Sequence, residues 1–327
     1  MWRQLIKWLD SYNYEKNPSL APSIRRLTRE DWVRCLPYVG MHLACFAVIW
    51  VGWSPIALWT ALAAYFIRMF AITGFYHRYF SHSAFKTGRL MQFIFAAIGS
   101  ASTQRGPLWW AAHHRFHHKH SDTDSDIHSP KLFGFFWSHT GWFMSESNFR
   151  TKTKLVKDWN RFPELIFLDR FDILAPVFYA TSLFLIGGYL ERYHPQLQTS
   201  GGQLLTWGFF ISTVALYHGT FTINSLAHVW GSRRYKTSDH SKNNPFLALI
   251  TLGEGWHNNH HRYPIAARQG FAWWEFDITF YILKIFEKLG LVWDLKIVPP
   301  SVYPGKPEEK QVNTANTNLK LLKTATL

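Results

Sequence analysis

Cysteine is scarce in this chain of 327 residues, which contains only Cys35 and Cys45. Two cysteines are too few for a disulfide framework or for a cysteine-rich zinc site, so both are excluded. Acidic residues are also few, because 21 Asp and Glu stand against 35 Lys and Arg and leave a formal net charge of +14. A charge of this size indicates an anionic partner, which can be a nucleic acid or a membrane surface.

The sequence also lacks the patterns that nucleic-acid-binding proteins use. It contains neither a mixed basic and aromatic stretch for single strands nor a helix typical of groove reading. Long apolar runs are present instead, so a membrane surface explains the positive charge better than nucleic acid does. The apolar side chains of the first ten residues share one helical face: Trp2, Leu5, Ile6 and Leu9. We expect this helix to lie on a membrane, and the alternative is an ordinary soluble cap.

Four apolar stretches approach the length of about 20 residues that a membrane-spanning helix needs. They cover residues 36–53, 56–76, 172–190 and 204–223. Positive charge indicates their orientation. Residues 1–35 hold 7 Lys and Arg, residues 77–171 hold 13 and residues 224–327 hold 13, whereas the turns within the two helix pairs hold only Arg192. We therefore expect both termini and both large loops on the cytosolic side.

The predicted fold is an all-α membrane protein with four transmembrane helices and a helical cytosolic cap. Residues 1–35 form a cytosolic or interfacial segment, residues 36–303 form the membrane domain with its cap, and residues 304–327 form a polar, disordered tail. A fifth apolar run, residues 91–101, is too short to span. Arg68 falls inside the second predicted span, where a charge is costly, and the sequence gives no reason for it.

Histidine, in contrast, is abundant, with 17 in the chain. Eight fall into three short clusters and a ninth ends the run of residues 224–228: His77 and His82, His114, His117 and His118, His257, His260 and His261, and His228. Residues three or four apart share a face of a helix, so each cluster can point at a common centre. Neutral imidazole is a frequent ligand of redox iron and of zinc. Nine ligands exceed the need of one metal, and we predict two irons that activate O2.

Other metal chemistries fit this pattern less well. Soluble di-iron bundles use Glu together with Glu-x-x-His pairs, which are missing here. A zinc hydrolase needs about three ligands and an open position. We expect four other histidines to orient the ligands, namely His113, His120, His128 and His139. Four more are expected to be ordinary helix or loop residues, namely His42, His194, His218 and His240.

The histidine motifs resemble those of the integral-membrane fatty acyl desaturases of the stearoyl-CoA, or delta-9, type. The similarity runs from about residue 30 to 300. It rests on HRYFSH at 77–82, HRFHH at 114–118, NSLAH at 224–228 and GEGWHNNHH at 253–261, with further matches at 134–142 and 274–279. Residues 104–114 are similar to bacterial members of this type, which implies a bacterial inner membrane.

The resemblance implies a specific reaction and a specific site. It implies that O2 and two Fe ions, held by the nine histidines and through water by Asn224, introduce a cis double bond into a saturated acyl chain. An unactivated methylene needs such a metal centre, because side chains alone cannot abstract its hydrogen. Electrons would come from an external carrier such as ferredoxin or cytochrome b5. The implied substrate tunnel bends at Gln104, Trp110 and Thr220.

The second predicted span is expected to close this tunnel. Tyr65 and Met69 precede His77 by about three and two helical turns, which puts them about 18 and 12 Å deeper in the bilayer. By resemblance to the family, a bulky Met69 favours an acyl chain of around sixteen carbons. The alternative is that both side chains only pack against the neighbouring span.

One departure from the resemblance concerns the head group of the substrate. Animal acyl-CoA members carry Arg-Asp before the second histidine motif and Arg-Lys after the Gly-Trp motif. This chain has Ala112-His113 and Glu146-Ser147 instead. Acyl-CoA, acyl carrier protein and phospholipid chains therefore all remain open as substrates. A nearby basic cluster can bind phosphates or anionic lipid: Arg150, Lys152, Lys154 and Lys157.

Two other functions are compatible with histidine clusters on a membrane protein. A membrane hydroxylase of alkyl or sterol substrates uses similar histidine motifs, although the context of residues 224–228 and 253–261 favours a desaturase. A metal transporter would place its ligands inside the spans. The clusters here lie outside the predicted spans, which disfavours transport.

Overall fold

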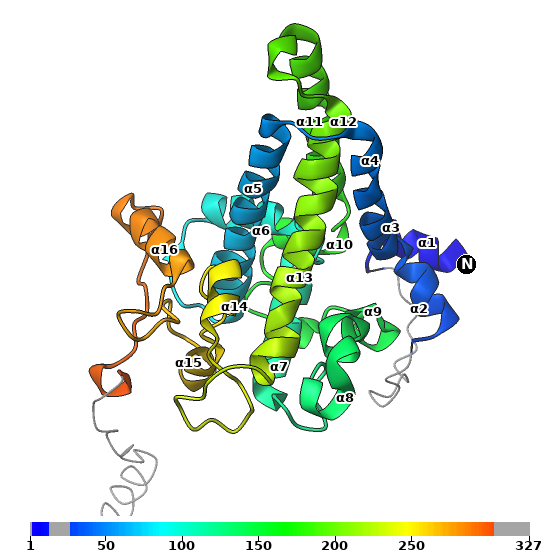
Figure 1. The fold of residues 1–327 in the computed structure, drawn as a ribbon. Coiled ribbons are helices and arrows are strands. Elements are labelled where there is room, and N and C mark those ends of the chain that lie inside the picture. Colours follow the sequence, from blue (N-terminus) through cyan, green and yellow to red (C-terminus); the bar gives the residue numbers. More distant parts are fainter. Residues whose placement is uncertain (1, 13–26, 304–327) are drawn as a thin grey trace, which may run out of the picture.

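The computed structural model describes residues 2–12 and 27–303, and these residues are mostly helical (Figure 1). The sheet structure among them is one antiparallel pair of short strands, β1 (Lys86–Thr87) and β2 (Val292–Trp293). The expectation of a helical fold is therefore confirmed. The predicted disordered tail lies outside the described residues, as does the middle of the N-terminal segment.

Two helices are long and apolar enough to cross a membrane. The first begins as α5 (Pro55–Phe70) and continues as a π-helix, η2 (Ala71–Ser81). Its start is well defined, because Pro55 occupies the first turn and the Ser54 hydroxyl accepts the backbone N–H of Ala57 at 3.1 Å. The second is α11 (Leu174–Tyr193), which corresponds to the third predicted span.

The first and fourth predicted spans are helical but meet this criterion less well. The first is a shorter apolar helix. The fourth is helical without a break, but its sequence includes polar residues such as Thr213 and His218. Their parts are α3 (Leu36–Ala44), η1 (Cys45–Ala47) and α4 (Val48–Val51), and α12 (Gly201–Leu205), η7 (Thr206–Ile211) and α13 (Ser212–Ser225). Length and composition thus identify two of the four predicted spans.

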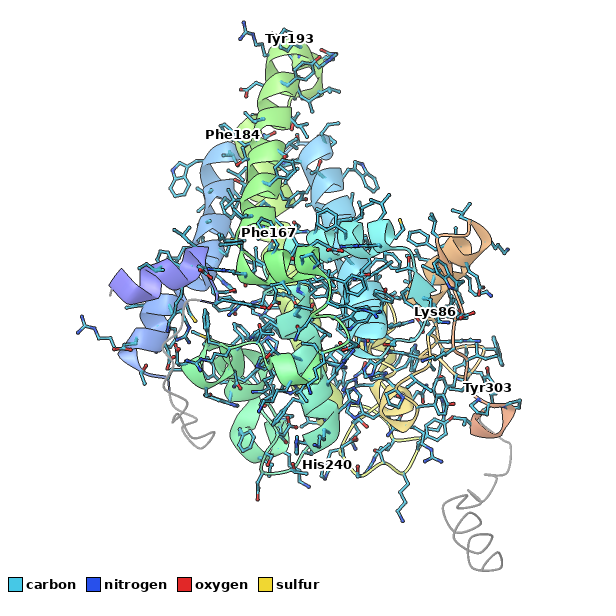
Figure 2. The ribbon with its side chains drawn as sticks, turned by 180° about the vertical axis from the view of Figure 1, so that it is seen from behind. Lys86, Phe167, Phe184, Tyr193, His240 and Tyr303 are labelled. Atoms are coloured by element: carbon cyan, nitrogen blue, oxygen red, sulfur yellow. The ribbon has the colours of Figure 1, made fainter. Side chains whose placement is uncertain are left out.

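The long helices and the short ones separate along the molecule. In Figure 1, α4, α5, α11 and α12 form the upper part, and the shorter helices gather around the lower end of α13. Seen from behind in Figure 2, Tyr193 and Phe184 lie at the upper end, whereas His240 and Tyr303 lie at the lower end. The lower helices are α7 (Pro107–His120), α8 (Pro130–Phe136), η3 (Trp137–Gly141), α9 (Trp142–Met144), η8 (Leu226–His228), α14 (Pro245–Ile250) and α15 (His257–Arg262).

The remaining helices flank this framework. Near the N-terminus these are α1 (Trp2–Leu9) and α2 (Arg29–Arg34). Further along are α6 (Arg89–Ser100), α10 (Pro163–Arg170) and α16 (Ile278–Lys288), with short 3-10 turns η4 (Glu146–Asn148), η5 (Thr153–Leu155), η6 (Pro195–Leu197) and η9 (Pro300–Val302). The run predicted at residues 91–101 is α6, a short apolar helix as expected.

Apolar side chains face outward on the upper helices. Trp50 on α4, Trp59 on α5 and Phe178 on α11 are 79 %, 69 % and 76 % exposed. Apolar surface of this extent on adjacent helices is typical of a membrane or protein contact. The interior is different, because η2 is buried along its whole length and carries the largest hydrophobic core of the described residues. The exterior therefore indicates association with a membrane.

Candidate metal centre and substrate cavity

Four segments bring the predicted histidines to the lower end of the long helices. The π-helix η2 carries His77, and His82 caps its C-terminal end. The second cluster lies in the last turns of α7. A π-helix closes hydrogen bonds between residues i and i+5, so two histidines five apart fall on one face. The short turn η8 ends at His228, and α15 begins at His257.

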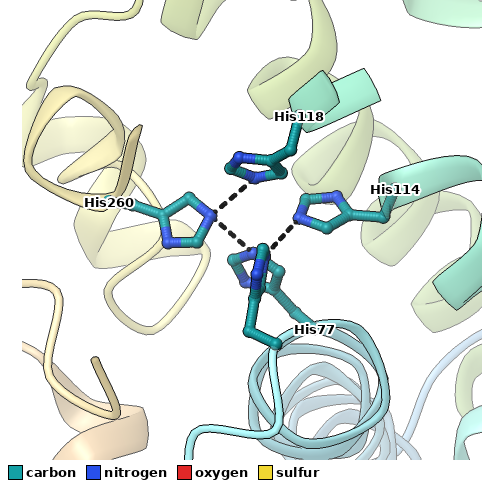
Figure 3. A group of neighbouring side chains, drawn as sticks. His77, His114, His118 and His260 are labelled. Carbon is teal, nitrogen blue, oxygen red and sulfur yellow. Dashed lines mark hydrogen bonds between the residues drawn. The ribbon is translucent and has the colours of Figure 1, made fainter. Parts of the chain in front are cut away.

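The nine predicted histidines form two neighbouring groups, and in each group one ring nitrogen per residue lies within 4.8 Å of all the others. Figure 3 shows four members of the first group pointing toward a common centre. The first group is His77, His82, His114, His118 and His260, and the second is His117, His228, His257 and His261. Consecutive positions on a helix point about 100° apart, so α7 and α15 each supply both groups.

Ring nitrogens face one another directly within the groups. In the first group the Nε2 atoms of His82 and His114 are 2.8 Å apart, and His260 Nε2 lies 3.0 Å from His77 Nε2. In the second group His228 Nε2 and His257 Nε2 are 3.1 Å apart. A neutral imidazole has one N–H donor and one lone pair. With the proton on Nε2 of one partner, such a contact is an N–H···N hydrogen bond. With both protons on Nδ1, two lone pairs face one another, an arrangement that a shared cation stabilises.

Carboxylates hold the opposite ring nitrogen of several of these histidines. The Nδ1 atoms of His117 and His228 lie 3.0 Å from Asp126 and 2.9 Å from Asp122. Because a carboxylate accepts, each Nδ1 carries the proton and Nε2 keeps its lone pair for a ligand. His261 and His77 have the same arrangement with Asp239 and Glu254.

These four carboxylates were not predicted from the sequence, which led us to expect histidines in the orienting role. A signal was present, because two of them follow the second histidine motif closely and Glu254 lies inside GEGWHNNHH. Of the four histidines expected in this role, His128 stacks on His117 with ring centres 4.2 Å apart. His139 instead bonds to Ser225 and His218, away from both groups.

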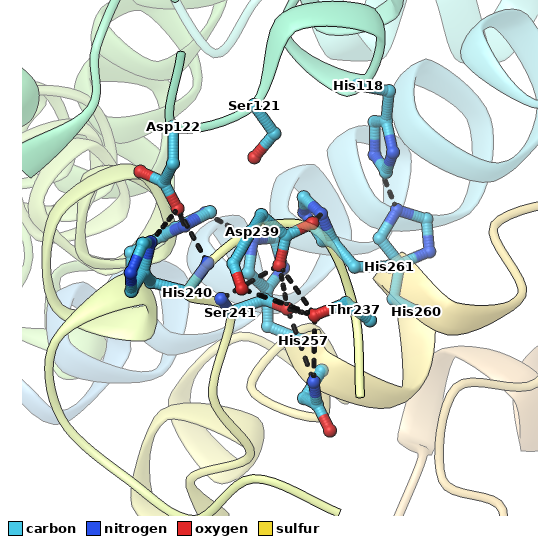
Figure 4. A network of polar contacts seen from close by, with 12 residues as sticks. His118, Ser121, Asp122, Thr237, Asp239, His240, Ser241, His257, His260 and His261 are labelled. Atoms are coloured by element: carbon cyan, nitrogen blue, oxygen red, sulfur yellow. Dashed lines mark hydrogen bonds and ion pairs between the residues drawn. The ribbon is translucent and has the colours of Figure 1, made fainter. Parts of the chain in front are cut away.

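Two of the carboxylates, Asp122 and Asp239, are held in place by further polar contacts, several of which are drawn in Figure 4. Asp122 accepts from the Ser129 hydroxyl at 2.5 Å and from the backbone N–H of His240 at 2.8 Å. Asp239 accepts from the Ser241 hydroxyl at 2.5 Å and from Thr237 at 2.9 Å. The segment before α14 thus serves to position two carboxylates behind the histidines.

Protonation states around the site suit metal binding. Burial alone would raise the pKa of Asp122 and Asp239, but hydrogen bonds from His228 and His261 hold each pKa well below its usual range. Burial lowers the pKa of four candidate ligands far below the usual value, namely His114, His118, His257 and His260, whereas the neighbouring Asp126 raises the pKa of His117 against the effect of its burial. Neutral imidazole, the form that binds metals, is therefore dominant in these four at neutral pH.

Buried nitrogen atoms without a partner point to the same conclusion. His261 donates from Nδ1 to Asp239 at 2.6 Å, and its buried Nε2 has no hydrogen-bond partner. A buried lone pair is normally satisfied by a hydrogen-bond donor, a water molecule or an ion, and here it faces the other imidazoles of the second group. A donor set made of imidazoles alone suits iron, zinc or copper rather than magnesium or calcium. The residues present therefore fit a pair of transition-metal ions.

A cavity of about 370 Å³ opens beside the first group. Its wall includes Gln104, Trp110 and Thr220, the predicted bend residues, together with Asn224 and His114. A smaller cavity of about 40 Å³ shares the last four of these residues. The amide of Gln104 donates to the Thr220 hydroxyl at 3.1 Å, so the bend residues touch where the two cavities meet.

The predicted tunnel-end residues lie close to the smaller cavity. Met69 lines it together with His77, whereas Tyr65 is outside the described lining of both cavities and donates its hydroxyl to the Ile250 carbonyl at 2.6 Å. Both side chains abut Gly219 on α13, where an added Cβ would meet the Tyr65 hydroxyl at 2.8 Å and Met69 Cε at 3.1 Å. They therefore pack against the neighbouring helix at the edge of this cavity.

The basic side chains that line the larger cavity are all paired with carboxylates. Lys7 on α1 and Arg34 on α2 both bind Glu146, at 2.8 and 2.5 Å. Arg105 binds Asp172 at 2.6 Å. The basic cluster considered for phosphate binding is absent from the described lining of both cavities: Arg150, Lys152, Lys154 and Lys157.

Comparison with known proteins gives a consistent picture. Residues 15–294 match the sequence profile of the family described as fatty acid desaturase. A probable chloroplast lipid desaturase of Arabidopsis thaliana is 36% identical over 286 residues, which cover 86% of this chain and 75% of the relative. The sn-1 stearoyl-lipid 9-desaturase of Anabaena variabilis is 34% identical over 270 residues, covering 82% and 94%. An acyl-CoA C20 Delta5-desaturase of Anemone leveillei is 34% identical over 288 residues, covering 86% and 87%.

Proposed function

Since the chain belongs to the fatty acid desaturase family and is a fatty acyl desaturase, we propose that it introduces a cis double bond at carbon 9 of a saturated acyl chain, using O2 and two iron ions. The observation that carries this proposal is the pair of all-histidine groups beside the junction of the two cavities. Nine histidine ligands exceed the requirement of a mononuclear site. A methylene held at this junction lies next to both groups.

The two groups divide the proposed ligands between the irons. His77, His82, His114, His118 and His260 would hold one ion, and His117, His228, His257 and His261 the other. Asn224, which lines both cavities, would reach one of the two ions through water. When bound, the iron pair supplies the O2 activation and hydrogen abstraction that side chains cannot. Asp122, Asp126, Asp239 and Glu254 keep the protons on Nδ1, so that the lone pairs stay directed at the metals.

The chain's own side chains would select the carbon that reacts. Acyl methylenes are chemically alike, so selection must come from the shape of the cavity. Gln104, Trp110 and Thr220 would form the bend between the cavities, and Met69 would limit the far side, with Tyr65 beside it against Gly219. A chain of around sixteen carbons is expected to fill the space up to Met69.

We favour an acyl chain attached to a membrane lipid over a soluble thioester. A CoA head group carries several phosphates and needs free cations, whereas Lys7, Arg34 and Arg105 are each paired. The cavity wall also includes Met41 on α3 and Val177 on α11, which belong to the apolar helices. An acyl chain can therefore enter from the bilayer. The relatives act on both kinds of substrate by name, since they include lipid and acyl-CoA desaturases.

The proposed setting is a multi-pass membrane protein with four spans and a cytosolic active site. Both termini would face the cytosol, and by its sequence the protein suits a bacterial inner membrane. An external carrier such as ferredoxin or cytochrome b5 would supply two electrons per double bond. The net charge of +14 favours an acidic carrier, because opposite charges speed the encounter of the two proteins.

Lipid profiling tests this function directly. The chain is expressed in a host that makes no unsaturated fatty acids, and the double-bond position is read by mass spectrometry. We expect cis-9 monounsaturated chains, and none from the His117→Ala variant. Alcohols in place of alkenes would support the hydroxylase alternative. Offering the purified enzyme a palmitoyl phospholipid, palmitoyl-CoA and palmitoyl carrier protein separately then identifies the head group, and turnover of the CoA ester alone would refute the lipid preference.

A further inference from the structure

Arg68 is a buried charge inside α5, in the first of the two long apolar helices. Only 2 % of its surface is exposed, and among the described residues its hydrogen-bond partners are hydroxyl and carbonyl oxygens rather than carboxylates. Charged side chains are costly in membrane helices and persist where they have a specific role. The metal site does not explain Arg68, and the residue is not part of the described lining of either cavity.

The guanidinium of Arg68 bridges three other segments. It donates to the Ser212 and Thr213 hydroxyls on α13 at 2.5 and 2.6 Å, and it lies over the ring of Tyr179 on α11 at 5.0 Å. It also contacts a loop, because it donates to the carbonyl oxygen of Ala101 at 3.1 Å. Arg68 therefore fixes the start of the segment that follows α6.

That segment, residues 101–106, is here called the bend loop, and its conformation is strained. Thr103 and Arg105 have φ values of 55° and 71°, in the left-handed region that residues other than glycine rarely adopt. Such residues persist only when the surroundings hold them in place. The Tyr217 hydroxyl donates to the Thr103 carbonyl at 3.2 Å, and Gln104 donates to Thr220 at 3.1 Å.

The bend loop forms a wall of the larger cavity through Thr103, Gln104 and Arg105. Its far end is fixed by the ion pair of Arg105 with Asp172. Its near end is tied to α6 by backbone hydrogen bonds from residues 101–103, and among the described residues Arg68 is the side chain that holds the Ala101 carbonyl and links this end to α5. If this end is released, the loop can shift relative to α13, and the part of the cavity wall that it forms shifts with it.

We propose that Arg68 is a positioning residue that sets the carbon at which the double bond forms. It acts through the bend loop, whose start it ties to α5 by the bond to the Ala101 carbonyl, so that Gln104 meets Thr220 at the bend. This inference rests on the proposed function, because it needs the bend to select the reacting carbon. Arg68 itself touches neither the substrate nor the metals.

The test is Arg68→Met in the full chain, produced in the host that lacks unsaturated fatty acids and then purified with its iron. We expect iron content to match that of the wild type, while isomers with the bond at neighbouring carbons rise about tenfold, the change that loss of one charge-assisted hydrogen bond brings. Arg192→Met, at the opposite end of α11, should give a single isomer.

A second variant separates the loop from helix packing. Ser212→Ala combined with Thr213→Val removes the α13 partners of Arg68 but leaves its bond to Ala101, so a single isomer is expected. The proposal would be overturned if this variant gave the same mixture of double-bond isomers as Arg68→Met, or if iron-loaded Arg68→Met gave a single isomer. If Arg68→Met fails to fold, Arg68→Lys is tested instead, because Lys keeps the charge but lacks the planar set of donors of a guanidinium. This variant must then yield the mixture of double-bond isomers. A wild-type chain that makes no alkene would instead defeat the proposed function.

Discussion

At the scale of single residues, His260 is the most connected member of the histidine groups. Its Nε2 lies 2.9 Å from His118 Nε2 and 3.0 Å from His77 Nε2, so it joins ligands from α7 and η2. Its ring is fully enclosed, and its Nδ1 has no hydrogen-bond partner. No neighbour can take over its place if the ring is removed.

His260→Ala should therefore abolish desaturation and reduce bound iron, because the other four members of the first group lose the ligand that links them. Alkene yield and metal content of the purified protein measure the two effects. His194→Ala serves as the control, since His194 follows α11 at the other end of the molecule and should be nearly silent. Full activity of His260→Ala would refute the assignment of two irons.

The carboxylates behind the histidines make a second prediction. In Asp239→Asn the side chain loses its charge, and the His261 proton is held less firmly. Loss of such a partner typically costs about 10- to 100-fold in metal affinity or activity. Iron titration of the metal-free protein measures it. Asp294→Asn is the matched control, because Asp294 pairs with Lys86 on the exposed surface, and both variants binding iron equally would contradict the role.

At the scale of helices, local sequence pattern was informative where the contacts are local. The apolar runs predicted α5 and α11, and the short spacings within each histidine cluster predicted helices that carry neighbouring ligands. The apolar pattern of the second span predicted a regular α-helix and not the π-helix η2. The five-residue spacing of His77 and His82 fits one face of a π-helix but not of an α-helix.

Long-range pairs could not be predicted in this way. Asp122 and His228 are 106 positions apart, and the Arg68 contact with Ser212 spans 144 positions. Such contacts depend on how helices pack, and no periodicity within a single helix encodes them. This explains why the nine histidines were found from the sequence while their carboxylate partners were missed. Metal binding by the nine stays a prediction.

The helix α5 makes its own prediction through Met69. This side chain lines the smaller cavity, so Met69→Ala should lengthen the space available to the methyl end by about three methylenes. The product ratio should then move from C16:1 toward C18:1 with the bond still at carbon nine, as measured by gas chromatography. Met91→Ala on α6, which is outside the described lining of both cavities, should leave the ratio unchanged. A shifted bond or an unchanged ratio in Met69→Ala would place the tunnel end elsewhere.

At the scale of the whole molecule, the long apolar helices and the candidate ligands occupy different ends. Exposed aromatic residues such as Trp50, Trp59 and Phe178 lie on α4, α5 and α11, whereas the candidate ligands lie on η2, α7, η8 and α15 or at their ends. Basic residues are concentrated in the terminal segments and in the large loops, whereas Arg192 is alone in the turns. This distribution is the physical basis for the expected cytosolic active site.

Topology can be measured with reporters. A reporter fused after residue 195 should be accessible from outside, because this position follows α11 at the upper end of the molecule. A reporter at the C-terminus should be cytosolic. Cell-impermeant labelling distinguishes the two sides, and an external C-terminus would refute the count of four spans.

The division of α7 and α15 between the two histidine groups has a consequence for assembly. His117 and His118 are adjacent in the chain yet belong to different groups, as do His260 and His261. An ion bound by one group therefore draws in and orders the same two helices that the other group needs. Uptake of the first ion lowers the entropic cost of the second, so loading should be cooperative and half-filled molecules should be rare.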